Sequence, residues 1–66
     1  MIIKISWRDK MRRMDIPRGW DIERILIRMG INPETVVVMK NGEVSPEFER
    51  VSKEDSLEII DIVSRG

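Results

Sequence analysis

The sequence contains no cysteine and no histidine, and these two absences exclude several kinds of chemistry. Without cysteine, the chain has no disulfide framework, no thiolate nucleophile and no cysteine-type zinc site. Without histidine, it lacks the side chain that most often serves as a general base or metal ligand near neutral pH. We therefore expect no metal site in this chain.

An excess of one charge is also missing. The chain has 12 lysines and arginines and 12 aspartates and glutamates, so its formal net charge is zero. Nucleic-acid-binding domains usually carry a clear basic excess. The balance argues against a protein built mainly to bind nucleic acid.

Long apolar runs and targeting signals are absent as well. No stretch approaches the roughly 20 apolar residues of a membrane-spanning helix, and the start of the chain lacks the regions of a signal peptide. These absences predict a cytoplasmic protein without membrane contact. Alanine, glutamine and tyrosine are missing and 36% of the residues are charged, a bias typical of thermophilic proteins.

Sixty-six residues are enough for one small domain. A domain near this size buries only about 60% of the surface that its unfolded chain exposes, so its core must be compact. We expect a single monomeric domain over residues 1–66, with a flexible C-terminal tail from about residue 63.

Two strands are expected in residues 1–16, joined by a polar hairpin turn at residues 8–10. Apolar side chains recur at every second position of both segments, which is the period of a half-buried strand. The expected core positions are Ile3, Ile5, Trp7, Met14 and Ile16.

An amphipathic helix is expected from about residue 20 to residue 29. Its apolar side chains recur at i, i+3, i+4 and i+7 and form a single stripe. Gly30 follows as the glycine that commonly ends a helix. The stripe consists of Ile22, Ile25, Leu26 and Met29.

The next segment predicts a hairpin followed by an irregular stretch. Residues 35–40 are a β-branched run, and Asn41-Gly42 is the strongest short signal of a hairpin turn. Residues 43–45 would form the short return strand. Phe48 and Val51 are expected to close over the core from the irregular stretch that follows.

The last strand carries apolar side chains on two faces. Leu57 and Ile59 alternate with polar residues and predict a core face, whereas Ile60 and Ile62 would point to the opposite face. An exposed apolar surface on a small domain often marks an interaction site. Our candidate partner-binding patch consists of Val37, Met39, Ile60 and Ile62, with Ile2 as a further candidate. A homodimer contact, or a face covered by loops, is the alternative interpretation.

The expected order is strand, strand, helix, strand, strand, strand. One amphipathic helix and several one-sided strands fit a helix lying across one face of a mixed sheet of four to five strands. With the first and last strands paired in parallel at the centre, this is an α+β fold of the β-grasp, or ubiquitin-like, type.

Two segments carry a family resemblance. Residues 31–44, which run into the Asn41-Gly42 turn, resemble the strand–turn–strand segment of small sulfur-carrier proteins of the ThiS and MoaD type and their archaeal modifier relatives. Residues 55–60 resemble the entry to the last strand of these proteins, and the order of elements matches along nearly the whole chain. Such carriers usually end in Gly-Gly, whereas this sequence ends in Arg65-Gly66.

The resemblance implies a carrier rather than an enzyme. In such carriers a ubiquitin-activating-type enzyme uses ATP to adenylate the carboxylate of the terminal glycine, here Gly66, which then becomes a thiocarboxylate. Ser64 and Arg65 would belong to the tail that enters the partner. The other implied partner is a sulfur-accepting enzyme or target protein, in thiamine, molybdopterin or tRNA thiolation chemistry. The carrier itself would bind no cofactor.

A second hypothesis is a β-grasp interaction module that binds a protein or RNA without acyl chemistry. Trp7 and Trp20 could stack on bases, although their positions favour a place against the core. A basic cluster surrounds the first hairpin and consists of Arg8, Lys10, Arg12, Arg13 and Arg18. Aspartates interrupt this cluster, so a solvated face of mixed charge is the favoured interpretation.

Overall fold

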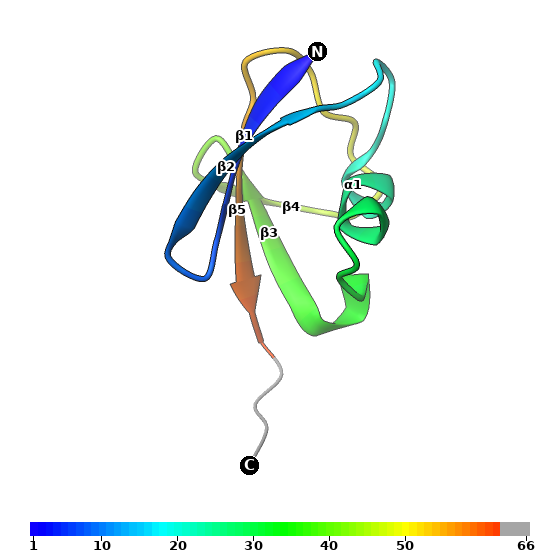
Figure 1. The fold of residues 1–66 in the computed structure, drawn as a ribbon. Coiled ribbons are helices and arrows are strands. Elements are labelled where there is room, and N and C mark those ends of the chain that lie inside the picture. The colour runs from blue at the N-terminus through cyan, green and yellow to red at the C-terminus, as the bar shows by residue number, and fades with distance from the viewer. Residues whose placement is uncertain (63–66) are drawn as a thin grey trace.

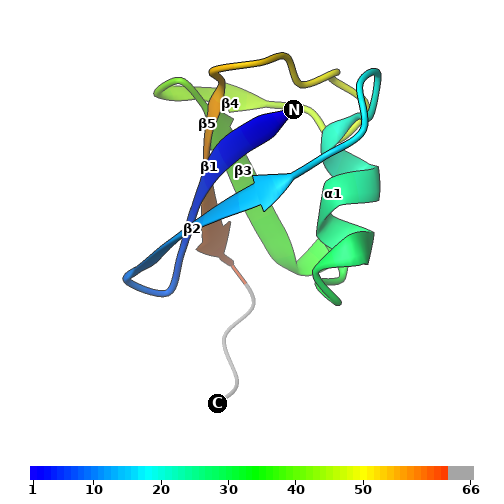
Figure 2. The ribbon, with the colours of Figure 1, turned by 45° about the horizontal axis from the view of Figure 1, so that its top comes forward.

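The computed structural model describes residues 1–62, which form a five-stranded mixed sheet with one α-helix packed on one face (Figures 1 and 2). The strands are β1 (Ile2–Trp7), β2 (Lys10–Asp15), β3 (Val36–Lys40), β4 (Glu43–Ser45) and β5 (Ser56–Asp61), and the helices are α1 (Ile22–Arg28) and the short 3-10 helix η1 (Pro33–Thr35). The strand order is β2-β1-β5-β3-β4. The predicted β-grasp fold is confirmed. The predicted tail from about residue 63 lies outside the described residues.

The first and last strands lie side by side at the centre of the sheet. β1 and β5 run parallel, with Ile5 opposite Leu57 and Trp7 opposite Ile59. β2 pairs antiparallel with β1, and β3 pairs antiparallel with β5. Because side chains alternate along a strand, this register places the apolar positions of both central strands on the face covered by α1. We call this the inner face, and the opposite one the outer face.

Both hairpins turn through two residues with positive φ. Arg8 and Asp9 have φ of 51° and 61°, and Asn41 and Gly42 have φ of 53° and 85°. Two successive residues with positive φ match the turn that suits the right-handed twist of paired strands. Asn-Gly adopts this shape readily, whereas a left-handed arginine is uncommon and must be held by its surroundings.

The helix begins at Ile22, the first residue of its apolar stripe, rather than near residue 20 as predicted. Asp21 is the N-cap, and its carboxylate accepts a hydrogen bond of 2.9 Å from the backbone N–H of Arg24. Trp20 therefore precedes the helix and packs against the core cluster from the loop. The helix ends before Gly30, whose φ of 77° matches the predicted left-handed residue.

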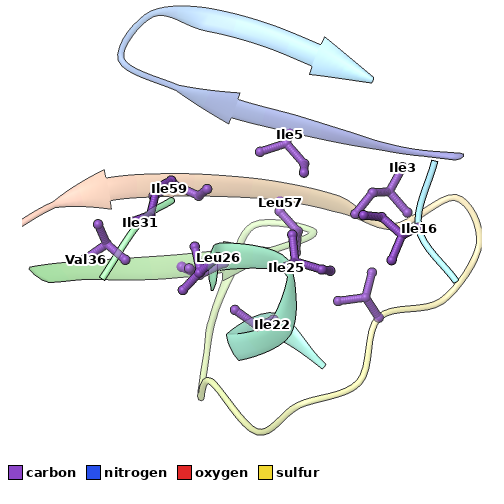
Figure 3. Packing of buried hydrophobic residues seen from close by; sticks show 12 residues of the cluster. Ile3, Ile5, Ile16, Ile22, Ile25, Leu26, Ile31, Val36, Leu57 and Ile59 are labelled. Atoms are coloured by element: carbon purple, nitrogen blue, oxygen red, sulfur yellow. The ribbon is translucent and has the colours of Figure 1, made fainter. Parts of the chain in front are cut away.

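The core lies between α1 and the inner face of the sheet (Figure 3). Fully burying a large aliphatic side chain contributes about 1.5–3 kcal/mol, so a compact aliphatic cluster can sustain a domain of this size. The buried side chains are Ile3, Ile5, Ile16, Ile22, Ile25, Leu26, Ile31, Val36, Val38, Val51, Leu57 and Ile59, and the partly buried Trp7, Met14 and Met29 pack against them. These positions include most of those predicted from the periodicity.

Phe48 corrects one prediction, because its side chain is 76% exposed and does not close over the core. The segment around it runs past the start of α1, where the carbonyls of Glu47 and Glu49 accept hydrogen bonds from helix N–H groups. With the backbone of its two neighbours turned to the helix, the intervening side chain points to solvent. Val51 is buried as predicted.

A hydrogen-bonded lock joins the β3–β4 turn to the start of β5. The Asn41 side chain donates to Asp55 Oδ1 at 2.8 Å and accepts from the Ser56 N–H at 2.9 Å, while Asp55 Oδ2 accepts from the Ser52 N–H at 2.7 Å. Partial burial tends to raise the pKa of Asp55, but the hydrogen bonds from Ser52 and Asn41 and the nearby Lys40 cation lower it overall. The ionised carboxylate is therefore part of the fold.

Candidate functional site

The outer face carries an apolar patch over β3, β4 and β5. Val37 lies opposite Ile60 in the β3–β5 register, and Met39 lies opposite Val44 in the β3–β4 register. The N–H of Ile62 donates to the carbonyl of Thr35 at 3.0 Å, which extends this pairing by one more step. We call this surface the apolar patch. Its members are Val37, Met39, Val44, Ile60 and Ile62.

Three of the five side chains in the patch are exposed to solvent. Val44 is 71% exposed, Ile62 is 57% exposed and Ile60 is 39% exposed, while Val37 and Met39 are half-buried. The structure thus brings together the four residues that the sequence placed in one patch. On a domain of this size, such a contiguous apolar surface is suited to burial against a partner.

Val44 was missed from the sequence, although a signal for it existed. A two-residue turn at Asn41-Gly42 pairs Lys40 with Glu43 and therefore pairs Met39 with Val44. Ile2, the further candidate, lies on the outer face but at the other end of the sheet. β1 and β5 run parallel, so Ile2 begins one strand whereas Ile60 is near the end of the other.

The predicted chemistry falls beyond the described part of the chain. Gly66, the predicted site of adenylate and thiocarboxylate formation, and the tail residues Ser64 and Arg65 lie outside the described residues. The last described residue, Ile62, is a member of the apolar patch. The patch therefore reaches to within four residues of Gly66 along the sequence.

The predicted basic cluster is divided between different parts of the molecule. Lys10 and Arg12 lie opposite Trp7 and Ile5 on the inner face. Arg13, by the alternation of the strand, belongs to the outer face, and Arg18 lies in the loop before α1. A hollow of about 420 Å³ on the inner side of the first hairpin is lined by Trp7, Arg8, Lys10 and Arg12, and we call it the basic hollow.

Asp61 fixes one wall of this hollow. It accepts a hydrogen bond from Arg8 Nε at 2.9 Å and from the indole N–H of Trp7 at 3.3 Å. The guanidinium carbon of Arg8 lies 4.3 Å from the centre of the Trp7 ring, within range of a cation–π contact. The hydrogen bond from Arg8 is the main cause that lowers the pKa of Asp61; desolvation opposes it, and the hydrogen bond from Trp7 adds a smaller lowering effect. These contacts also hold the left-handed Arg8 in its turn.

A comparison with known proteins bears on the family resemblance. Sulfur carrier protein TtuB of Thermus thermophilus is 29% identical over 55 residues, which cover 83% of this chain and 85% of that protein. This chain is similar to a small sulfur-carrier protein over most of its length. The family resemblance predicted from the sequence is therefore confirmed, although no protein-family model matches the chain. The match spans most of both chains, so the similarity extends over the whole domain and is not confined to one motif.

Neither a metal-binding cluster nor a membrane-spanning helix occurs in the part of this chain that the structure describes. Within residues 1–62, no three acidic side chains gather closely enough to hold a metal ion. In the same residues, neither helix has the length and apolar character needed to cross a bilayer.

Proposed function

We propose that this chain is a sulfur carrier whose Gly66 carboxylate is activated by a separate adenylating enzyme. The observation that carries the proposal is the similarity to a named sulfur carrier across most of the chain. The β-grasp fold agrees with it. In this proposal the chain is a protein substrate and not an enzyme.

The apolar patch supplies a docking surface for the activating enzyme in this proposal. Ile60 and Ile62 lie at the end of the last strand, directly before the segment that must reach the partner's active site. Docking through these side chains would bury apolar surface and hold the following residues close to the bound ATP. Binding energy gained at the patch would thereby hold the Gly66 carboxylate in position. Holding reactants in the correct geometry accelerates their reaction.

The proposed chemistry takes place in two steps. A carboxylate oxygen of Gly66 attacks the α-phosphorus of ATP, pyrophosphate leaves, and an acyl-adenylate forms. Hydrosulfide, or a donor equivalent to it, then attacks the acyl carbon. The new carbon–sulfur bond replaces the carbon–oxygen bond to AMP, and a thiocarboxylate and AMP result. All of the catalytic groups and the ATP site belong to the partner, so the carrier needs no cofactor. The use of ATP agrees with a cytoplasmic location.

Intact-mass measurement of the chain tests the proposal. The purified protein is incubated with the ubiquitin-activating-type enzyme of its source organism, ATP and sulfide. We expect a mass change that corresponds to replacement of one oxygen by sulfur, and we expect none when Gly66 is deleted. The variant Ser64→Ala, which changes the same segment but keeps the terminal glycine, serves as the matched control and should react normally.

Arg65 provides a second arm of this experiment, because carriers of this type usually end in two glycines. Arg65 carries a side chain and a more restricted backbone than glycine. If the natural partner accepts arginine, the unchanged chain and Arg65→Gly should both be converted. Conversion of Arg65→Gly alone would contradict the proposal and indicate that carrier chemistry has been lost.

The second candidate is an interaction module that uses the same apolar patch without acyl chemistry. The exposure of Ile60, Ile62 and Val44 favours a protein partner in that case. The two functions differ in their dependence on Gly66. A module would bind its partner equally well after Gly66 is deleted, and its C-terminal carboxylate would remain unmodified in protein isolated from the source organism.

A further inference from the structure

The basic hollow lies apart from the apolar patch and has no part in the proposed carrier chemistry. It is formed on the inner side of the first hairpin, where α1 does not cover the sheet (Figure 2). Lys10 lies opposite Trp7, and Arg12 lies opposite Ile5. The two cations are therefore adjacent on one face of the edge strand β2, with Arg8 in the turn beside them.

The charges of the hollow are incompletely balanced. Arg8 is paired with Asp61 at 2.9 Å. Within residues 1–62, no carboxylate oxygen lies within 4.0 Å of the cationic nitrogens of Lys10 or Arg12. Like charges that are neighbours on one face of a sheet repel each other. A bound anion would relieve this repulsion, and the zero net charge of the whole chain does not prevent it, since screening limits charge interactions to about 10 Å.

The position of the Trp7 ring favours a phosphate group over a stacked nucleobase as the ligand of the hollow. One face of the ring is covered by the Arg8 guanidinium, and the ring also packs against the core cluster. A nucleobase could stack on Trp7 only by displacing Arg8 and breaking its ion pair with Asp61. The hollow therefore offers cationic donors for a phosphate but no open aromatic face for a base.

We propose that the basic hollow binds phosphate groups, with Lys10 and Arg12 as the main ligands. The lysine supplies a compact positive charge, and the arginine supplies a planar fork that donates two hydrogen bonds to one phosphate. Arg8, held by Asp61, forms the wall. The phosphates can come from a free oligophosphate or from the backbone of single-stranded RNA, and recognition would not depend on base sequence. This inference does not rest on the sulfur-carrier function.

Nuclear magnetic resonance titration tests the site, because the two tryptophans are natural reporters. Trp7 lines the hollow, whereas Trp20 precedes α1 and is absent from its lining. The probes are sodium tripolyphosphate and a short oligouridylate, each added at low salt. We expect a saturable shift of the Trp7 indole N–H with at least one probe and no matching shift for Trp20. A response to tripolyphosphate alone would identify free oligophosphate, and tighter binding of the oligouridylate would identify the RNA backbone.

A pair of matched double variants decides whether the hollow itself is the site. Lys4 and Arg13 lie directly opposite each other on the outer face of the same two strands that form the hairpin. Lys4→Gln with Arg13→Gln therefore removes the same charge as Lys10→Gln with Arg12→Gln. We expect the second pair to raise the Kd at least about tenfold and to lower the salt slope by about two, as for two lost phosphate contacts. Equal weakening by the outer-face pair, or no saturable shift with either probe, would overturn the proposal.

Discussion

The two faces of β5 carry similar side chains in opposite surroundings. On the inner face, Leu57 and Ile59 are 2% and 4% exposed, whereas on the outer face Ile60 and the following Ile62 are 39% and 57% exposed. One strand thus contributes apolar surface both to the core and to the solvent. The first pair is explained by folding. The second pair gains nothing comparable from folding, which agrees with the docking role proposed for it.

Truncation of the inner face should have the largest effect on stability. Leu57→Ala removes a buried side chain of β5 from the core cluster and should lower the free energy of unfolding by about 2–5 kcal/mol. Ile60→Ala, on the same strand, should cost much less because Ile60 is already partly solvated. Chemical denaturation measures both. Equal losses would contradict the distinction between the two faces.

Loss of the hydrogen-bonded lock should have the next largest effect. Asp55→Ala removes the acceptor for Asn41 and the Ser52 N–H and should cost about 1–3 kcal/mol. Because the folded-state pKa of Asp55 is lowered, its ionised form stabilises the fold above the unfolded pKa of about 3.9, and this contribution is lost as the pH falls through the folded value.

Acid unfolding measures whether the Asp55 carboxylate stabilises the fold in its ionised form. The stability of the unchanged protein should fall as the pH is lowered below about 4, and Asp55→Asn should show a shallower fall because it has one fewer carboxylate to protonate. Glu49 and Asp61, whose pKa values are also lowered, should continue to contribute in the same direction. A steeper fall in Asp55→Asn would show that the carboxylate does not stabilise the fold.

A charge on the outer face should impair partner binding while leaving the fold intact. Ile60→Asp should lower kcat/KM for activation by the partner about tenfold, equivalent to about 1.4 kcal/mol of lost binding. The midpoint of denaturation should change little. Lys4→Asp is the control and should have a weaker effect on activation, because Lys4 lies opposite Ser56 at the start of β5 whereas Ile60 lies near its end.

The smallest effect is expected at the aromatic residue that the sequence placed in the core. Phe48→Ser should change the free energy of unfolding by less than about 0.5 kcal/mol, as is usual for exposed sites. Val51→Ala, in the same loop, should cost more because Val51 is buried. Denaturation of the two variants side by side measures the difference, and a large loss in Phe48→Ser would contradict the exposed position.

Much of the fold followed from local signals. The helical stripe, the Asn41-Gly42 turn and the alternation of Leu57 and Ile59 each depend on neighbours within a few residues, and each was confirmed. The short helix η1 was missed because its three residues, which begin at Pro33, show no apolar periodicity. The position of Phe48 was wrong because hydrogen bonds from a distant helix decide which way its loop turns.

The sequence by itself determined which side chains are apolar, how they alternate along each strand and where the chain can turn, because these properties depend on covalent structure and short-range sterics. Only the tertiary structure decided which strands are neighbours. The pairing of β1 with β5 separated Ile2 from the apolar patch, whereas the registers of the two hairpins added Val44 to the patch and divided the basic residues of the first hairpin between two faces. The β1–β5 register joins segments far apart in the chain, and the burial of a shared core selects it.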